Sequence, residues 1–237
     1  MHVEHVMGTA VSFDVRGERP ARAAIDAAVT WLHEVDAEFS TYRHDSAVSR
    51  LGRGDLPAEQ ASAHLRWVIR RCEQLRAETG GHFDACATGA FDPSALVKGW
   101  AVQRAADGLQ AAGIERFCIN AGGDVVAHGP WRVGIRHPLD AQAIAAVVEA
   151  EDLAVATSGA YARGDHVLNP YTRRPPSDVL SVTVVGAQLA TADAYATAAF
   201  AMGAEAAPHW TARLRGYEAL TILADDTVLS TGGFPHD

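Results

Sequence analysis

The stretch from Phe91 to Gln110 constrains the fold of this chain more than any other part of the sequence. It opens with Asp92 and Pro93, a carboxylate that can cap a helix and a ring that needs no amide partner. Beyond this opening, apolar side chains recur at helical spacing and share one face, at Trp100, Ala101, Ala105 and Leu109. The pattern predicts a helix that starts at the Asp-Pro pair and packs one face into a core.

Lys98 and Gly99 fall within the first two turns of this predicted helix. A helix start presents unbonded N–H groups and a partial positive charge, so a lysine beside it favours a seat for phosphate groups. A simpler interpretation exists, because many structural helices begin with Asp-Pro and a lysine there is usually solvated. The stretch alone leaves both interpretations open.

Helices and clustered strands together indicate an α+β fold. The expected helices cover residues 21–39, 59–79, 92–113 and 191–202, the last with Thr191 as cap and Gly203 as stop. The expected strands cover 6–15, 116–120, 131–136, 180–185, 220–223 and 228–230. Residues 39–51 are predicted to form a polar loop, and Gly8 to mark a close approach to the first strand. With no linker or repeat, we expect one domain over residues 1–237, with mixed or antiparallel sheets packed by helices.

The composition limits the possible partners. The 237 residues carry a formal net charge of −9, which argues against nucleic acid as a partner because its backbone needs clustered Lys and Arg. The charge does not exclude a phosphorylated small molecule held by a metal ion. Apolar residues make up 48% of the chain, enough for a sizeable core. No run of about 18 apolar residues occurs, so we expect no membrane span.

The N-terminal sequence and the cysteines favour a cytoplasmic protein. The first residues show neither the basic start and apolar run of a signal peptide nor a lipobox. Cys72, Cys86 and Cys118 form no Cys-x-x-Cys pair and resemble buried small residues.

Several kinds of active site find no support in the sequence. Eleven histidines are present, but there is no HExxH and no Cys/His ligand cluster for zinc. GxGxxG and the Walker pattern are absent, and Ser158 lies in Thr-Ser-Gly rather than in GxSxG. Oxygen ligands remain as the candidate chemistry.

Asp193 and Thr197 are spaced four apart on the predicted helix 191–202 and therefore share a face. A carboxylate and a hydroxyl at this spacing can both reach a hard cation such as Mg²⁺. Spacing alone favours the structural interpretation, in which the Asp serves the helix dipole and the Thr bonds to a carbonyl. His166 precedes a turn that ends in proline; it could act as a base near neutral pH or be an exposed loop histidine.

Eight sequence blocks carry a family resemblance. They are MGT at 7–9, FSTYRHDSAVSRL at 39–51, GGHFD at 80–84, DPSALVKGWAVQ at 92–103, NAGGDV at 120–125, VATSGAY at 155–161, HVLNPYTRRP at 166–175 and ADAYATAAFAMG at 192–203. In this order the blocks resemble the ApbE family, the FAD:protein FMN transferases, also described as flavin-trafficking proteins. The likeness covers nearly the whole chain.

The resemblance implies a chemistry. The family binds FAD and Mg²⁺ and moves FMN onto a threonine or serine hydroxyl of an acceptor flavoprotein, with release of AMP; some members instead hydrolyse FAD to FMN and AMP. By the same resemblance, Asp193 and Thr197 are magnesium ligands, and Ala95 is a third through its backbone carbonyl. His166 matches the proposed base and a FAD contact, so the implied catalytic residues are His166 and Asp193. The other implied FAD contacts are Met7, Tyr42, His82, Phe83, Asp84, Asp92 and Lys98.

Four departures from the family pattern leave the kind of member open. Asn169 replaces the usual Asp after the histidine, Arg173-Arg174 replaces Thr-Gly, Ala196 replaces a second Asp, and the segment between Asp84 and Asp92 is short. The chain is thus a compact variant. Three hypotheses follow: a flavin transferase acting on a protein, an FAD pyrophosphatase, and a non-catalytic FAD-binding or trafficking protein.

Overall fold

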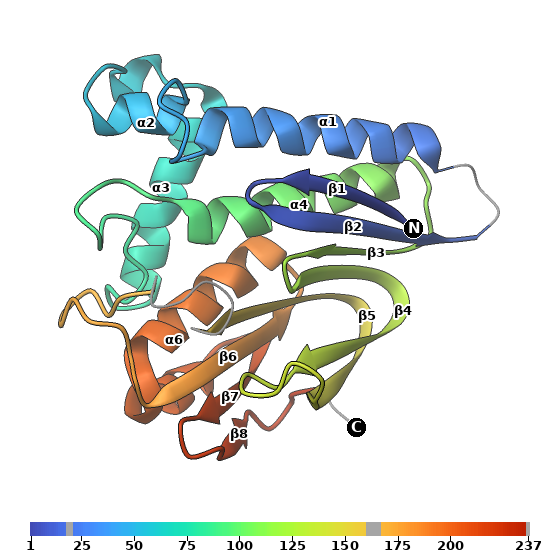
Figure 1. Ribbon diagram of the computed structural model, residues 1–237, viewed down its shortest axis with the longest axis vertical. Helices are drawn as coiled ribbons and strands as arrows, with labels where there is room; N and C mark the ends of the chain where they lie inside the picture. The colour runs from blue at the N-terminus through green and yellow to red at the C-terminus, as the bar shows by residue number, and fades with distance from the viewer. Residues whose placement is uncertain (18–20, 160–166, 236–237) are drawn as a thin grey trace.

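The protein is built on one eight-stranded sheet with helices against it (Figure 1). The computed structural model describes residues 1–17, 21–159 and 167–235. Its strands are β1 (His2–Val6), β2 (Thr9–Arg16), β3 (Arg116–Ala121), β4 (Asp124–Arg136), β5 (Ile144–Gly159), β6 (Val179–Gly186), β7 (Tyr217–Leu223) and β8 (Val228–Ser230). Its helices are α1 (Arg22–Phe39), α2 (Ala47–Gly52), the 3-10 turn η1 (Ala58–Gln60), α3 (Ala63–Glu78), α4 (Ser94–Ala111) and α6 (Leu189–Thr211).

The sheet order follows the chain from β1 to β8, and each neighbouring pair is antiparallel. The predicted α+β class is confirmed. Of the two sheet types expected, the described strands form only the antiparallel one.

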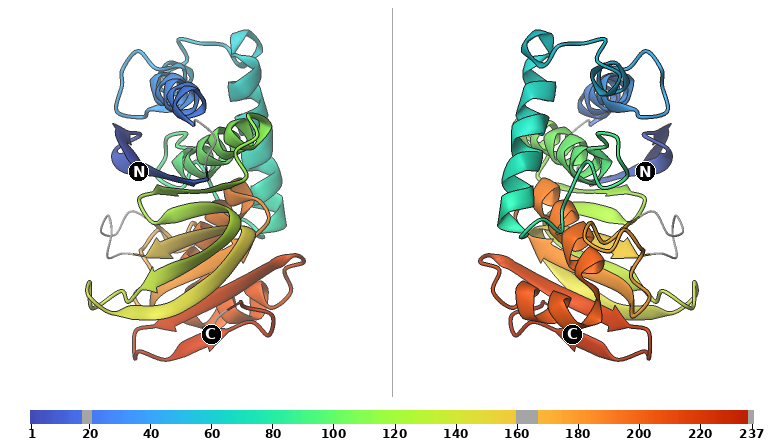
Figure 2. Two further views of the ribbon diagram at one scale, coloured as in Figure 1. Left: turned by 90° about the vertical axis from the view of Figure 1, so that its right-hand side faces the viewer. Right: turned by 90° about the vertical axis from the view of Figure 1, so that its left-hand side faces the viewer.

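Helix α4 occupies the centre of the molecule, between α1, α3, α6 and the strands β3 and β4 (Figures 1 and 2). The predicted shared face is confirmed: Trp100, Ala101, Ala105 and Leu109 are all buried. Side chains on other faces of α4 are also buried, among them Leu96, Val97, Val102 and Ala106. A helix that buries several of its faces fixes the position of its neighbours, and this holds the α4 side chains in place.

A second, smaller core lies among β4, β5, β6 and β7, apart from the main core that contains α1, α4 and α6. The two cores lie on opposite faces of the sheet, because successive side chains along a strand point to opposite faces. In β4, Val126 belongs to the main core, whereas its neighbours Val125 and Ala127 belong to the small one. Phe234 from the C-terminal segment packs into the small core. Strands buried on both faces in this way show little apolar–polar alternation, as in β5, where residues 154–156 are buried in succession.

Two local predictions at the N-terminal end of the chain need correction. Residues 9–15 of the expected strand 6–15 lie in β2, but Met7 and Gly8 have φ values of 54° and 70° and turn the chain, so that Val6 belongs to a separate strand, β1. Gly8 is therefore required by the turn; a Cβ there would meet no atom within 4 Å. The expected loop 39–51 contains α2, which begins where the Ser46 hydroxyl accepts the Ser49 N–H at 3.1 Å.

Helix α6 begins two residues earlier than the predicted cap Thr191. Its first amide, at Leu189, donates to the Gln103 side chain of α4 at 2.9 Å, so a partner from another helix satisfies the start. Gly203 does not end the helix; with φ 81° and ψ −178° it joins two helical halves across a kink. The Asp178 carboxylate then accepts the Ala204 N–H at 3.1 Å, which caps the second half.

The expectation of buried cysteines holds for only part of the set. Cys72 is buried, Cys118 is half-buried and Cys86 is exposed, and all three are free thiols. Burial raises the pKa of the Cys72 thiol to about 12 and that of Cys118 to about 11.

Candidate functional site

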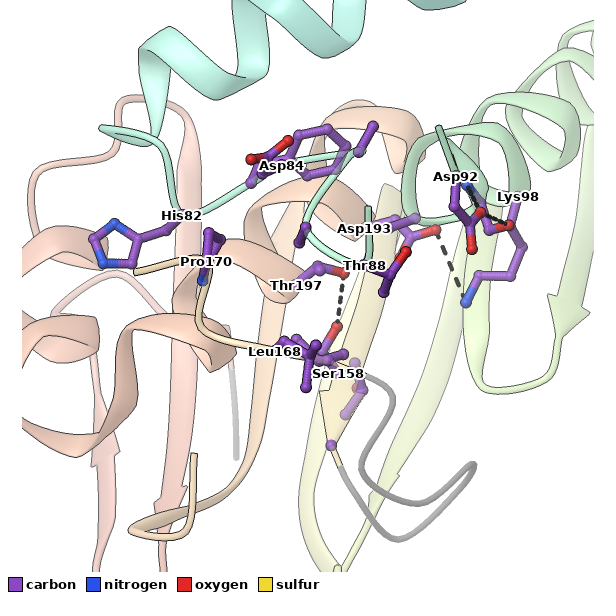
Figure 3. Close-up of a pocket in the computed structure, with 18 of the residues that line it drawn as sticks. His82, Asp84, Thr88, Asp92, Lys98, Ser158, Leu168, Pro170, Asp193 and Thr197 are labelled. Carbon is purple, nitrogen blue, oxygen red and sulfur yellow. Dashed lines mark hydrogen bonds and ion pairs between the residues drawn. The ribbon is translucent and has the colours of Figure 1, made fainter. Parts of the chain in front are cut away.

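A pocket opens where the start of α4, the first half of α6 and the end of β5 meet (Figure 3). Its polar lining comes from all three elements and from the turn before α4, and includes His82, Asp84, Thr88, Asp92, Ser94, Lys98, Thr157, Ser158, Asp193 and Thr197. The pocket therefore brings Lys98 together with Asp193 and Thr197, which the sequence analysis had assigned to a different helix. We call α4 and α6 at this pocket the helical wall.

Gly99 permits the close approach of α4 to α6. A Cβ at this position would lie 2.8 Å from the Leu189 carbonyl oxygen and 3.0 Å from the Asp193 Cβ. The two backbones are in contact there, and the Gly99 N–H donates to Asp193 Oδ2 at 3.2 Å across 94 residues of sequence. This bond fixes the Asp193 carboxylate, which is 3% exposed.

Lys98 places a cation between two carboxylates. Its Nζ forms an ion pair with Asp124, the first residue of β4. It also lies 3.8 Å from Asp193 Oδ2 (Figure 3). Asp124 is 1% exposed, and its Oδ1 accepts the Thr157 N–H of β5 at 3.2 Å. The lysine predicted to be either solvated or a phosphate contact is thus a partly buried member of a charge cluster.

The hydroxyl of Thr197 lies beside that of Ser158, with 3.2 Å between the two oxygens (Figure 3). Contacts between side chains therefore connect β5 to α6 as well as β4 to α4. The oxygen atoms that line the pocket therefore belong to helices and strands whose relative positions are fixed by these contacts. Ala95, the third expected metal ligand, lines the same pocket from the first turn of α4.

The start of α4 is already capped by its own chain. Asp92 Oδ1 accepts the Ser94 N–H at 3.0 Å and also the Ser94 hydroxyl. The carboxylate expected to cap the helix accepts its first amide from two positions before the first helical residue, with Pro93 between them. Because Asp92 already occupies the Ser94 N–H, the start of α4 has fewer N–H donors available to an anion than an uncapped helix start.

The turn after α3 carries three expected FAD contacts. His82 Nδ1 lies 3.2 Å from the Thr79 carbonyl, and the Phe83 N–H donates to the Thr79 hydroxyl at 2.9 Å. Asp84 Oδ1 accepts the Cys86 N–H at 2.8 Å, which tightens the short segment before α4. All three side chains line the pocket, but Phe83 is 2% exposed and belongs mainly to the core.

A second loop packs on this turn through Tyr171. The phenol donates to the Gly80 carbonyl, and its ring lies 5.1 Å from the His82 ring. Gly81 leaves space for this contact, since a Cβ there would lie 2.6 Å from the Tyr171 oxygen. We call residues 79–84 and 167–174 the loop wall of the pocket.

Asn169 has a structural role in the loop wall. Its Oδ1 accepts the backbone N–H groups of Tyr171 at 2.9 Å and Thr172 at 3.2 Å, and its backbone pairs with Arg174. Arg173 takes a left-handed conformation, with φ 56°, inside this turn. The departures from the family pattern at 169, 173 and 174 therefore build one tight turn.

A second pocket continues from the first past the start of α4. Met7, Ser40, Thr41 and Tyr42 line it, together with Asp92, Ser94 and Lys98, which line the first pocket as well. Met7 and the highly exposed Tyr42 thus line the same pocket. Lys98 lies where the two pockets meet.

His166 lies outside the described residues. The neighbours described on either side, Gly159 and Val167, both line the first pocket. The sequence analysis missed Asp124 and Ser158 as site residues. Their only signal was membership of the NAGGDV and VATSGAY blocks, which were quoted without assigning a role to either residue.

Tyr195 holds α6 against α3 next to the site. Its hydroxyl donates to Glu78 Oε2 at 3.1 Å, and Glu78 is also bonded to Arg71 at 2.6 Å. Burial, with the negative charge of Glu78 as the next cause, raises the pKa of Tyr195 to about 12. The phenol therefore remains a hydrogen-bond donor well above neutral pH.

The described ranges contain neither a cluster of metal-binding side chains nor a membrane-spanning helix. Across residues 1–17, 21–159 and 167–235, no three His, Cys, Asp or Glu side chains group as a metal cluster would require. In the same part of the chain, no helix has the length and apolar character needed to cross a membrane.

Two segments, residues 7–90 and 87–221, match the model of the ApbE family. The chain belongs to the ApbE family. Among its relatives, a protein of Vibrio cholerae serotype O1 named FAD:protein FMN transferase is 38% identical over 130 residues, 48% of this chain and 39% of the relative. A protein of the same name from Rhodobacter capsulatus is 36% identical over 169 residues, 61% of this chain and 32% of the relative. The matched segments thus span about a third to two-fifths of these relatives' lengths.

Solved structures of other ApbE proteins have the same fold. The flavin transferase ApbE from Vibrio cholerae superposes with a TM-score of 0.87 at 25% identity, covering 98% of this chain and 97% of that one. The ApbE protein from Thermotoga maritima gives a TM-score of 0.88 at 21% identity, covering 100% of this chain and 99% of that one. The arrangement of sheet and helices is therefore that of the family over the whole described chain.

Proposed function

We propose that this ApbE protein is a Mg²⁺-dependent FAD:protein FMN transferase, which moves FMN from FAD onto a Ser or Thr hydroxyl of an acceptor flavoprotein and releases AMP. Family membership and the names of the relatives support the reaction class. The observation that carries the proposal is the position of Lys98 at the junction of two pockets, beside Asp193 and Thr197. A dinucleotide needs an elongated site with a cation near its middle, where the pyrophosphate lies.

The donor set of the pocket fits Mg²⁺. Asp193 offers a carboxylate and Thr197 a hydroxyl one helical turn away, and both line the pocket. Mg²⁺ prefers such oxygen ligands and completes its octahedron with waters or substrate phosphates. Ala95 would add its backbone carbonyl. When bound, the ion would stabilise the negative charge that develops on the pyrophosphate oxygens.

The remaining residues of the proposed site bind and orient FAD. Lys98 would contact the pyrophosphate, since an ammonium is well suited to a phosphate oxygen. Met7 and Tyr42 would hold one end of FAD in the second pocket. Asp92 and residues 82–84 would line the first. The acidic net charge of the protein is no obstacle, because a bound cation inverts the local sign.

The transfer step requires an oxygen nucleophile and a base. The acceptor hydroxyl oxygen would attack the FMN phosphorus, the bond from that phosphorus to the bridging oxygen would break, and AMP would leave. His166 is proposed to take the hydroxyl proton, because a hydroxyl is a weak nucleophile at neutral pH. This assignment rests on the resemblance alone.

One experiment tests the proposal. The purified protein is incubated with FAD, Mg²⁺ and a carrier protein that bears a D-x-x-[ST]-x-[AS]-[ST] acceptor segment, with an otherwise identical carrier lacking the hydroxyl as control. Flavin fluorescence on the denatured carrier, with AMP in solution, is the expected result. Release of FMN and AMP without labelling of the carrier would make the protein an FAD pyrophosphatase. Unchanged FAD would leave a non-catalytic FAD-binding protein.

A variant at Lys98 tests the pocket assignment in the same assay. Lys98→Met is expected to weaken FAD binding by about 1–3 kcal/mol, the contribution of a charge-assisted hydrogen bond. Binding is measured by the quenching of flavin fluorescence. Parental affinity in this variant would show that the pyrophosphate lies elsewhere.

A further inference from the structure

Asp124 is a buried carboxylate to which the proposed function gives no role. It begins β4 and is 1% exposed. One of its oxygens accepts the Thr157 N–H at 3.2 Å, and the other is paired with the Lys98 ammonium. Burying a carboxylate is costly unless it is paired and hydrogen-bonded, and both conditions are met here.

Asp124 does not line the ligand space itself. Among the described residues that line the two pockets, Lys98 occurs in both and Asp124 in neither. The contacts of the Asp124 carboxylate with the pocket lining are the Lys98 ammonium and the backbone N–H of Thr157. A residue in this position can hold or release the ammonium but cannot itself touch FAD or its cation.

Lys98 has a second carboxylate within reach. Its Nζ contacts Asp124 and stands 3.8 Å from Asp193 Oδ2. An ammonium and a divalent cation compete for the same carboxylate, and this competition is strong in a buried site of low dielectric. The position of the Lys98 ammonium between the two carboxylates therefore affects how tightly Asp193 can bind a cation.

We propose that Asp124 is a positioning residue that holds the Lys98 ammonium away from Asp193, so that Asp193 can bind a divalent cation while Lys98 stays at the junction of the pockets. The inference rests on the proposed function in one respect, since it takes Asp193 as a cation ligand. It adds a residue from β4 that sets cation affinity without touching the cation.

The change Asp124→Asn isolates this effect. Asn keeps the size of the side chain and an oxygen for the Thr157 N–H, but it removes the charge that attracts Lys98. The ammonium then moves toward Asp193 and competes with the cation. The additional change Lys98→Met removes the competitor, so Asp124→Asn should have little effect in that background.

The experiment measures the binding of Mn²⁺, a spectroscopic substitute for Mg²⁺, by electron paramagnetic resonance in the absence of FAD. The proteins compared are the parent, Asp124→Asn, Lys98→Met and the double variant. Asp124→Asn is expected to weaken Mn²⁺ binding about tenfold, which corresponds to one charge–charge coupling of about 1.4 kcal/mol. The double variant should bind Mn²⁺ within about twofold of Lys98→Met, the margin of independent sites. Glu205→Gln, an exposed charge loss on α6, is the control and should bind as the parent does.

Three results would overturn the inference. One is parental Mn²⁺ affinity in Asp124→Asn. Another is an equal loss from Asp124→Asn with and without Lys98, because Asp124 would then act by its own charge. If Asp124→Asn alone does not fold, Lys98→Met and the double variant are compared instead. Equal Mn²⁺ affinity of these two proteins supports the inference, and weaker Mn²⁺ binding by the double variant overturns it. The third is parental Mn²⁺ affinity in Asp193→Ala, which would remove the proposed cation site itself and so identifies failure of the proposed function separately.

Discussion

The two walls of the pocket are held in different ways. In the helical wall, α4 and α6 touch through backbone at Gly99, and Asp193 is a buried carboxylate that accepts the Gly99 N–H. The loop wall is joined by the Tyr171 hydroxyl and the Asn169 turn, and Tyr171 is 68% exposed. Buried contacts in a packed core resist displacement, whereas hydrogen bonds at the surface contribute little net stability because water replaces them readily.

This difference indicates a division of roles. The helical wall fixes where charges lie, which catalysis of phosphoryl transfer requires to within a fraction of an ångström. The loop wall shapes the entrance with contacts that can open at low cost, as surface segments with few buried contacts do. Changes in the helical wall should therefore damage chemistry and stability together. Changes to the contacts that join the two segments of the loop wall should affect local opening more than global stability.

The largest effect is expected from the chemistry of the helical wall. Asp193→Ala should lower Mg²⁺-dependent FAD turnover by more than about a hundredfold, because the cation loses its only carboxylate ligand of the proposed set. Turnover is followed by AMP release, and Glu205→Gln serves as the control for loss of a negative charge on the same helix. Retained turnover in Asp193→Ala, or in excess chelator, would remove the metal from the proposed function.

The packing of the helical wall should show the next largest effect. Gly99→Ala places a Cβ against the Leu189 carbonyl and Asp193, so the helices must separate, at a cost of about 1–3 kcal/mol in the free energy of unfolding. Gly108→Ala in the same helix meets no atom within 4 Å and should stabilise by about 0.5–1 kcal/mol through helix propensity. Urea unfolding measures both. Equal effects of the two substitutions would mean that α4 and α6 are less tightly packed than described.

The loop wall should respond more weakly. Tyr171→Phe removes the bond to the Gly80 carbonyl, which should cost less than about 1 kcal/mol because the bond is exposed. Hydrogen exchange should quicken at the amides of 79–84 and 167–174 while α4 and α6 keep their protection. A uniform change over all four segments would contradict the separation of the two walls.

The smallest expected effect is a pH dependence at the junction of α3 and α6. Because the pKa of Tyr195 is raised from 10.0 to about 12, an unfolded tyrosine ionises before the folded one does. Above pH 10 the unfolded chain therefore binds fewer protons, and this contribution to stability is lost as the pH rises toward 12. Tyr195→Phe should show a shallower fall in melting temperature over that range than the parent. Identical slopes would show that Tyr195 does not couple ionisation to folding.

Much of the helical wall could be predicted from the sequence. The Asp92-Pro93 start, the apolar spacing and the four-residue interval from Asp193 to Thr197 are local patterns, and local patterns determine helices. The role of Lys98 as a ligand contact stays a prediction; the structure places its side chain in the lining of both pockets, but its partners Asp124 and Asp193 could not be inferred from the sequence. Each comes from a distant part of the chain, and a single sequence contains no record of which distant residues meet.

The loop wall was much less accessible to prediction. Tyr171 and Gly80 are 91 residues apart, and both lie in irregular segments with no periodicity to align them. The hairpin at Met7-Gly8 was missed because a non-glycine residue with positive φ is uncommon, so Met7 gave no turn signal. The sequence identified Asn169 as a departure from the family pattern. Only the structure shows that its side-chain oxygen accepts two backbone N–H groups, those of Tyr171 and Thr172.

The strict order of the sheet has a consequence for how the chain reaches its native state. Each strand pairs with the strand before it in the sequence, and the connections within β1–β2, β3–β4, β4–β5 and β7–β8 are short, so these hairpins have little chain to close. The pairs β2–β3, β5–β6 and β6–β7 are joined by longer segments, the last of which contains α6. The contact between Gly99 and Asp193 cannot form in this way, because it joins residues 94 apart. We expect the proposed cation ligands to come together late in folding, when α6 docks on α4. A partly folded chain would then have most of its sheet but no capacity to hold the cation, and cation binding would report completed folding.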